Sequence, residues 1–209
     1  MSDLYNNFEE LKADNEYGVD YTVIHEFNDQ SDLIIVAPHG ENIEPLTSEL
    51  TTETSKNISS SYYIFGGIRS KNNFELHITS ANFDEPTALS QMNAVDYALS
   101  YHGYAGDDPN TIIGGLDEEL AMSVLDSLQS HGFSAEKATS KFTATNPNNI
   151  VNRTKTGMGV QLELSAAQRK LFTESGEMNR KSRQSLTEEF YRYVESVKKG
   201  LASVIEQRV

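Results

Sequence analysis

The segment DLIIVAPHGENIEP, residues 32–45, contains the clearest buried strand in the chain. Residues 32–38 form a continuous apolar run of strand length, which is typical of a strand covered on both faces. Pro38 and Gly40 flank His39 at the end of this run, so we expect the imidazole to project where the strand ends. A helix-like segment, residues 43–58, follows directly. This passage from a buried strand to a helix predicts one unit of an α/β fold.

Strand-like and helix-like segments alternate on both sides of this unit. We expect strands at residues 21–27, 32–38, 61–66, 74–79, 98–102, 111–115 and 159–164, and helices at residues 4–14, 43–58, 86–97, 117–131 and 184–206. Such alternation predicts a mixed, largely parallel sheet covered on both faces, with ligands bound beyond the carboxyl ends of the strands. No repeat or linker divides the chain, so we expect a single domain, residues 1–209, with residues 1–19 at its periphery.

The composition excludes several classes of protein. The chain has 17 Lys and Arg against 31 Asp and Glu, a net charge of −14, which argues against nucleic-acid and anionic-membrane partners because phosphate contacts need concentrated cations. There is no cysteine, so a metal site must use His, Asp and Glu. The amino-terminal residues lack the apolar core of a secretory signal, and no apolar run approaches the roughly 20 residues that span a membrane. We therefore expect synthesis in the cytoplasm.

The charge is unevenly distributed along the chain. Residues 1–60 carry 13 acidic and 2 basic side chains, a balance of 2 − 13 = −11. Residues 137–162 contain Lys137, Lys141, Arg153 and Lys155 and no acidic residue. A basic segment inside an acidic chain predicts a local surface that attracts anions, unless it is a chance cluster on a loop.

Two histidines and two glutamates could form a catalytic metal site. His39 and His102 each end a strand and precede a glycine, Glu44 follows His39 by five residues, and Glu163 alternates with leucines in the last strand. A catalytic zinc ion commonly takes three His or carboxylate ligands, and a further carboxylate acts as general base. These residues would supply every part, although Glu41 could replace Glu44 and the histidines could be structural.

Other residues have two possible roles each. His77 could be a hydrogen-bonded core residue or could face the site, and Arg153 could bind a substrate carboxylate with its planar fork or lie on the surface. A Ser–His–Asp triad lacks a G-x-S-x-G elbow to place its nucleophile, and no glycine-rich phosphate-binding motif is present.

Four segments in the same order resemble the poly-γ-glutamate hydrolases of bacteriophages and their bacterial relatives: APHGENIEP (37–45), LHITSANFDEPTAL (76–89), YALSYHGYAG (97–106) and NNIVNRTKTGMGVQLEL (148–164). The resemblance runs from about residue 20 to the end. It implies a three-layer α/β/α sandwich similar to the zinc carboxypeptidases, with one zinc ion per chain. The ligands implied are His39, Glu44 and His102, with Glu163 as general base. Asn152 and Arg153 resemble the carboxylate-binding pair of the carboxypeptidases.

The resemblance therefore predicts a phage-type enzyme that hydrolyses the γ-glutamyl amide bonds of poly-γ-glutamate, a bacterial capsule polymer. We expect Arg153, Lys155 and Arg69 to pair with the free α-carboxylates of the polymer, with Asn152 and His77 also facing the substrate. We expect a monomer that reaches its substrate after host lysis. The alternatives are a zinc amidase or deacylase acting on small acyl-glutamates, and a phage or surface interaction domain without activity.

Overall fold

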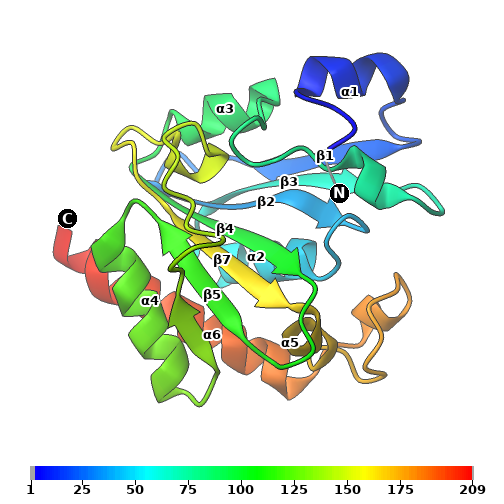
Figure 1. Ribbon diagram of the computed structural model, residues 1–209. Coiled ribbons are helices and arrows are strands. Elements are labelled where there is room, and N and C mark those ends of the chain that lie inside the picture. Colours follow the sequence, from blue (N-terminus) through cyan, green and yellow to red (C-terminus); the bar gives the residue numbers. More distant parts are fainter. Residues whose placement is uncertain (1–2, 209) are drawn as a thin grey trace.

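The framework of the computed structural model, which describes residues 3–208, is a seven-stranded sheet with strand order β1-β3-β2-β4-β7-β5-β6 (Figure 1). Only the pairs β1–β3 and β5–β7 are antiparallel. The prediction of a mixed, largely parallel sheet is confirmed. The strands are β1 (Tyr21–Glu26), β2 (Leu33–Glu41), β3 (Ser61–Gly67), β4 (Tyr97–Tyr104), β5 (Thr111–Gly115), β6 (Ala135–Lys137) and β7 (Val160–Ser165).

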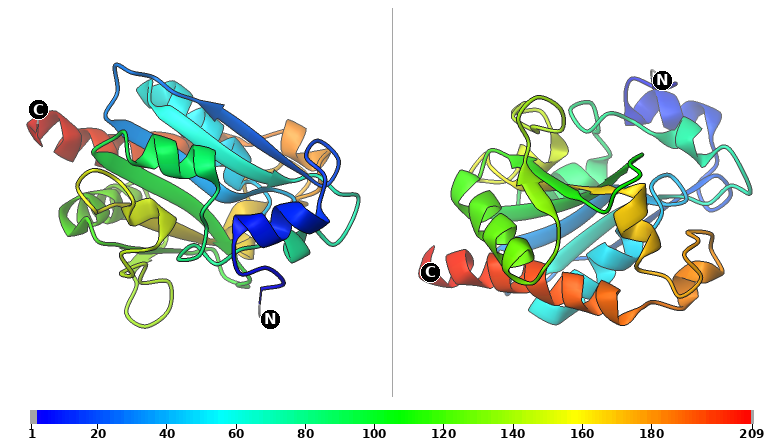
Figure 2. Two further views of the ribbon diagram at one scale, coloured as in Figure 1. Left: turned by 90° about the horizontal axis from the view of Figure 1, so that it is seen from above. Right: turned by 60° about the horizontal axis from the view of Figure 1, so that its bottom comes forward.

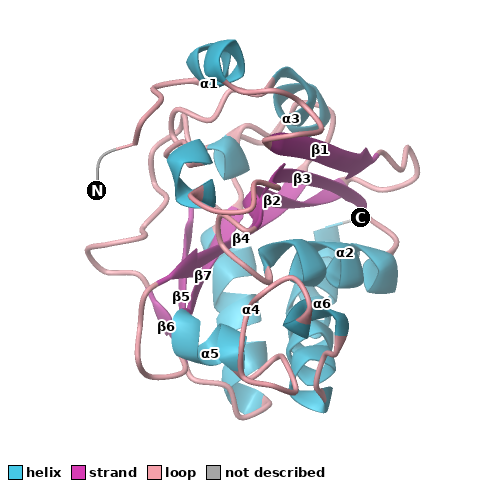
Figure 3. Ribbon diagram, turned by 90° about the vertical axis from the view of Figure 1, so that its right-hand side faces the viewer, coloured by secondary structure: helices cyan, strands magenta, loops and turns pink. Residues whose placement is uncertain are grey.

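Helices cover both faces of this sheet, which confirms the three-layer arrangement (Figure 3). One face carries α2 (Thr47–Ile58), α4 (Glu118–Ser130) and α6 (Glu188–Arg208), and the other carries α1 (Phe8–Asp14) and α3 (Pro86–Met92). In Figure 2, α6 runs beneath the sheet beside α4. The short helix α5 (Ala166–Lys170) follows β7, and three 3-10 helices lie in loops: η1 (Asn73–Leu76), η2 (Ile150–Asn152) and η3 (Ser182–Gln184).

Alternation along the strands divides the buried side chains between two cores. On β4, Leu99 and Tyr101 belong to the core beneath α2, α4 and α6, while Ala98 belongs to the core beneath α1 and α3. On β2, Ile35 belongs to the core beneath α2, α4 and α6, and Ile34 belongs to the core beneath α1 and α3. Even-numbered residues of β4 and odd-numbered residues of β7 therefore share the α1/α3 face, which carries the site described below.

The expected strand at residues 74–79 is wrong. Residues 73–76 form η1 instead, and an extended loop follows. Asn72 begins this turn in the left-handed region with φ 59°. Leu76 and Ile78 are fully buried beside the sheet without pairing to it, while Phe74 is half exposed. Apolar residues that lie in a loop but pack against the sheet therefore have the same alternation in sequence as the residues of a strand.

Several other boundaries differ from expectation: α2 begins at Thr47 rather than at residue 43, β2 extends to Glu41 rather than to residue 38, and β6 and α5 were not expected. Helix α3 ends at Met92 rather than at residue 97, because the backbone N–H groups of Asp96 and Tyr97 bond to the carbonyl of Asp32 where β4 begins beside β2. Within the segment expected at the periphery, residues 8–14 form α1, and Phe8 and Leu11 of this helix are buried in the core of that face. Among the helices within residues 3–208, none combines the length and apolar character needed to cross a membrane.

Candidate active site

His39 and Glu44 are brought together by the tight passage from β2 to α2. The pairing of β2 with β3 shifts register between Ala37 and Gly40, and the backbone N–H of Glu44 donates to the carbonyl of His39 over 2.9 Å. Nε2 of His39 lies 2.8 Å from the carbonyl oxygen of Ile78, which can only accept, so Nε2 carries the proton. In the neutral ring, Nδ1 is then an unprotonated donor atom that faces Glu44.

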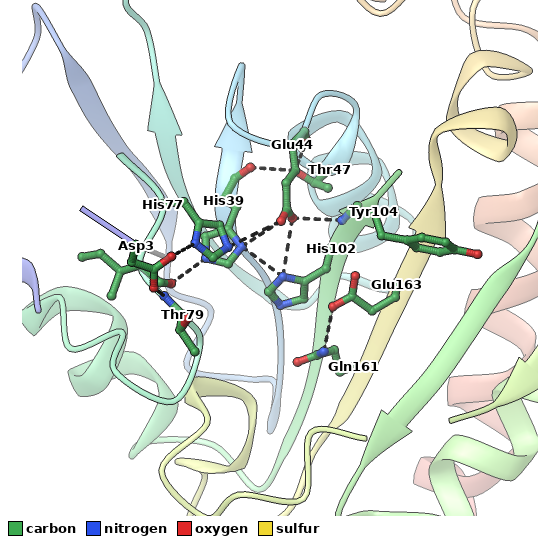
Figure 4. Close-up of polar contacts among 12 residues, drawn as sticks. Asp3, His39, Glu44, Thr47, His77, Thr79, His102, Tyr104, Gln161 and Glu163 are labelled. Atoms are coloured by element: carbon green, nitrogen blue, oxygen red, sulfur yellow. Dashed lines mark hydrogen bonds and ion pairs between the residues drawn. The ribbon is translucent and has the colours of Figure 1, made fainter. Parts of the chain in front are cut away.

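His102, near the end of β4, completes a buried cluster with these two residues (Figure 4). Nδ1 of His39 lies 3.1 Å from Nδ1 of His102 and 3.2 Å from Oε1 of Glu44, and Nδ1 of His102 lies 3.5 Å from Oε2 of Glu44. The backbone N–H of Gly103 also donates to Oε2 over 2.9 Å. Burial raises the pKa of Glu44, but the two imidazoles outweigh it and the pKa falls well below its usual range.

The spacing of these atoms fits a zinc ion. Ligands at about 2.0–2.1 Å in a tetrahedron are separated by about 3.3 Å. Nδ1 of His39 lies at close to that distance from Nδ1 of His102 (3.1 Å) and from Oε1 of Glu44 (3.2 Å), and the other oxygen of Glu44, Oε2, lies 3.5 Å from Nδ1 of His102. Nε2 of His102 is buried and has no hydrogen-bond partner within residues 3–208. His39, Glu44 and His77 form a second set with potential ligand atoms within 4.8 Å of one another. We prefer His102 as the third ligand, because Nε2 of His77 lies 3.8 Å from Glu44.

Glu163 lies on β7 directly beside His102, with which it is in register. Its neighbours Leu162 and Leu164 point into the opposite core, so its carboxylate faces the same side as His102. Burial and the Glu44 carboxylate raise the pKa of Glu163 to about 8, against the opposing effects of His39, Arg169 and Gln161.

Sequence analysis missed two amides that hold this carboxylate. Nε2 of Gln161 donates to Oε1 of Glu163 over 2.9 Å, and Nδ2 of Asn149 donates to Oε1 of Gln161 over 3.0 Å. All three side chains are buried. Gln161 could have been found from the sequence, because it lies two residues before Glu163 on the same face of the strand.

Arg169 of α5 is a buried cation that sequence analysis also missed. Its Nη1 donates to the carbonyl of Pro45 over 2.9 Å and its Nη2 to the carbonyl of Tyr104 over 3.2 Å. It therefore ties the turn that carries Glu44 to the end of the strand that carries His102. The guanidinium lies where Gly103 lacks a side chain, since a Cβ there would come within 2.6 Å of Nη1. No local pattern links residues this far apart in sequence.

His77 lies beside the cluster, between the rings of His39 and Phe74, whose centroids are 3.9 and 5.1 Å away. Its Nδ1 lies 2.6 Å from Oδ1 of Asp3. Burial and His39 lower the pKa of His77 to about 4, although Asp3 and Glu44 oppose them.

Glu41 is not available as a ligand in place of Glu44. Its Oε2 lies 3.2 Å from Nη2 of Arg183, and Nη1 of Arg183 donates to its backbone carbonyl over 2.8 Å. Arg183 is itself buried, so this pair holds Glu41 away from the two imidazoles.

The prediction that Lys155 faces the substrate is corrected by its position. Its Nζ lies 3.8 Å from Asp96 and 4.0 Å from Asp32, which precede β4 and β2. Lys155 also precedes β7, which runs parallel to β4. It therefore lies at the amino ends of these strands, at the opposite edge of the sheet from His39 and His102.

The other predicted substrate-binding residues differ in availability. Arg69 is occupied, since its Nε lies 2.9 Å from Asp20 and its Nη1 lies 3.0 Å from Glu75. The buried Asn152 braces its own loop, donating to the carbonyls of residues 144 and 146 and accepting from the N–H of residue 159. Arg153 is partly exposed, and its side chain makes no hydrogen bond or ion pair with the residues of the described range 3–208. Arg69 and Asn152 are therefore engaged within the protein, whereas Arg153 is free to bind a ligand.

Comparison with solved structures reveals close similarity over the whole chain. A bacteriophage poly-gamma-glutamate hydrolase is 39% identical, with 99% of this chain and 100% of that chain covered and a TM-score of 0.96. The zinc-free form of YNDL is 38% identical, with 96% and 98% covered and a TM-score of 0.89. An N-formylglutamate amidohydrolase from Ralstonia eutropha JMP134, 10% identical with a TM-score of 0.52 over 91% of this chain and all of that one, shares the fold alone.

Comparison with curated proteins and with family models points the same way. The UPF0714 protein YmaC of Bacillus subtilis (strain 168) is 40% identical over 94% of this chain and 83% of its own length. The SPbeta prophage-derived UPF0714 protein YoqZ of the same strain is 45% identical over 81% of this chain, which spans only 61% of YoqZ. The family model for poly-gamma-glutamate hydrolase matches residues 5–196. The chain therefore belongs to the poly-gamma-glutamate hydrolase family of enzymes.

Proposed function

We propose that this protein hydrolyses the γ-glutamyl amide bonds of poly-γ-glutamate with one zinc ion held by His39, Glu44 and His102. The observation that carries the proposal is the buried convergence of these three side chains at separations of 3.1–3.5 Å, with Glu163 in register beside His102. Bound zinc would polarise the scissile carbonyl and lower the pKa of water toward about 7. The similarity to YNDL, whose matched structure is the zinc-free form, supports the choice of metal.

Glu163 is the general base in this proposal. It takes a proton from the attacking water and passes it to the nitrogen of the leaving amine. Burial raises the pKa of its carboxyl, which makes the ionised carboxylate a stronger base. Gln161 is the only hydrogen-bond donor to this carboxylate within residues 3–208, and it contacts Oε1. Oε2 is therefore free to accept from water.

Two cations can bind the α-carboxylates of the polymer. Arg153 ends η2, and the backbone N–H of Ile150 in η2 donates to the carbonyl of Ser80, two residues beyond the Ile78 that holds His39. Lys141 lines a cavity of about 470 Å³ whose wall includes Ile112, the strand partner of Glu163. Cations at these two positions would engage different units of the polymer. Asn152 acts here by bracing the loop that carries Arg153.

The test combines metal analysis with measurement of polymer length. We expect about one zinc per chain, loss of polymer shortening on chelation, and no hydrolysis by Glu163→Gln with its zinc retained. Glu195→Gln, the same substitution on the partly exposed face of α6, should keep full activity. Hydrolysis by Glu163→Gln would remove Glu163 from the mechanism, and full activity without metal would exclude the zinc site.

Polymer length also discriminates the alternative. A zinc amidase or deacylase for small acyl-glutamates would release glutamate from small substrates and leave the chain length of the polymer unchanged. We further propose that the protein works as a monomer on capsule polymer outside the host cell after lysis. Mass measurement in solution and digestion of intact capsules test these two points.

A further inference from the structure

The amino-terminal segment reaches the active site through Asp3. Oδ1 of Asp3 lies 2.6 Å from Nδ1 of His77, and Oδ2 accepts from the backbone N–H of Thr79 over 2.6 Å (Figure 4). Both carboxylate oxygens are therefore occupied, and residues 3 and 77 are joined across 74 positions of sequence. The segment is anchored independently through α1, where the N–H of Phe8 donates to Asp84 over 2.7 Å.

These contacts determine where the protons of His77 lie. The N–H of Thr79 can only donate, and burial raises the pKa of Asp3 less than its hydrogen bonds to Thr79 and His77 lower it, so Asp3 is an ionised acceptor. Nδ1 of His77 must therefore carry a proton. Because Nδ1 donates to Asp3, the neutral ring leaves Nε2 without a proton.

The bare nitrogen faces the site. Nε2 of His77 lies 3.8 Å from Oε1 of Glu44, beyond hydrogen-bond distance. The stacking of the ring between Phe74 and His39 restricts its orientation. The repeating unit of poly-γ-glutamate offers a single kind of hydrogen-bond donor at neutral pH, the amide N–H, since its α-carboxylates and carbonyls only accept. A fixed acceptor beside the cluster is complementary to that N–H.

We propose that Asp3 is a positioning residue that holds His77 as the Nδ1–H tautomer, so that Nε2 accepts a hydrogen bond from an amide N–H of the polymer next to the bond that is cut. The substrate contact rests on the function proposed above. The tautomer does not, because it is a property of the protein without substrate.

Asp3→Asn gives a sharp test, because an amide has only one acceptor oxygen. Its oxygen must still meet the N–H of Thr79, which leaves its NH2 group facing Nδ1 of His77. His77 would then be forced to accept at Nδ1 and to carry its proton on Nε2. We expect 15N–1H correlation spectra to show the Nδ1–H form in the native protein and the Nε2–H form in Asp3→Asn, with and without zinc. His77→Gln identifies the resonances by their loss.

Asp84→Asn is the matched control. It removes the same charge from the other carboxylate that holds the amino-terminal segment, and its oxygen can still accept from Phe8. We expect Asp3→Asn to lower kcat/KM for the polymer about tenfold, the scale of one hydrogen bond, and Asp84→Asn to change it less than twofold.

Three results would overturn the proposal. A native Nε2–H or doubly protonated ring would remove its basis, as would an unchanged tautomer in Asp3→Asn. An inverted tautomer with unchanged kcat/KM would exclude the contact with substrate. Failure of Glu163→Gln to stop hydrolysis would reject the catalytic mechanism while leaving the tautomer measurement unaffected.

Discussion

Gly103→Ala should destabilise the protein by displacing a buried arginine. The new Cβ would come within 2.6 Å of Nη1 and 2.7 Å of Nε of Arg169. The guanidinium would have to move away from the carbonyls of Pro45 and Tyr104, to which it donates over 2.9 and 3.2 Å. The rest of the Gly103 environment is ordinary strand, so the clash with Arg169 is the main effect of the substitution.

The magnitude follows from the two lost hydrogen bonds. Each hydrogen bond from a charged donor contributes about 1.5–3 kcal/mol, so the pair is worth about 3–6 kcal/mol. Replacing a strand glycine by alanine restores about 0.5–1 kcal/mol, because glycine loses more backbone freedom on folding. We therefore expect a net loss of about 3 kcal/mol in the free energy of unfolding.

A double-mutant cycle isolates the cause. In an Arg169→Met background the clash with the guanidinium is absent, so Gly103→Ala should change the stability by less than about 1 kcal/mol. Urea unfolding of chelator-treated protein at pH 7 gives all four free energies without a contribution from bound metal. Equal losses in both backgrounds would refute the reasoning, as would a loss below about 1 kcal/mol in the native background.

Three further predictions concern the same end of the sheet. Gln161→Leu removes a hydrogen bond that lowers the pKa of Glu163, so the acidic limb of the kcat/KM profile should move to higher pH with the zinc content unchanged; superimposable profiles would contradict this. In metal-free protein the pKa of the Glu163 carboxyl is raised from 4.5 to about 8. Its contribution to the free energy of unfolding is therefore fully present below pH 4.5 and is lost as the pH rises through 8. Denaturant titration should therefore find Glu163→Gln at least about 1 kcal/mol more stable than the native chain at pH 9, with little difference at pH 5; an equal difference at both pH values would show that the carboxyl is not perturbed. His102→Gln should abolish stoichiometric zinc binding, measured by metal analysis after dialysis, and His77→Gln should retain it; the reverse pattern would make His77 the ligand.

The part of the site that lies on strands could be predicted because strand position and alternation are local properties. His39 and His102 end apolar strands, and the leucines around Glu163 indicate which face it takes. The position of Lys155 could also have been foreseen. A residue five positions before a parallel strand lies at the opposite edge of the sheet from residues that end its neighbours.

The rest of the site depends on contacts that no local pattern contains. Arg169 meets Pro45 across 124 positions, and Asp3 meets His77 across 74. The segment around His77 has the alternation of a strand, yet its apolar residues are buried from a loop. Its backbone pairs with no strand, and a one-dimensional pattern cannot distinguish burial from pairing.

The acidic balance of the first 60 residues does not by itself determine the charge at the site, because several of these carboxylates are paired through long-range contacts. Arg183 lies within 3.3 Å of Glu41 and Glu49, and Arg69 neutralises Asp20. Glu44 faces two imidazoles, and both oxygens of Asp3 accept hydrogen bonds. The arginines that perform this pairing are not available to a substrate. An acidic chain can therefore accommodate a polyanion with few free cations, provided that its own carboxylates near the cleft are already paired.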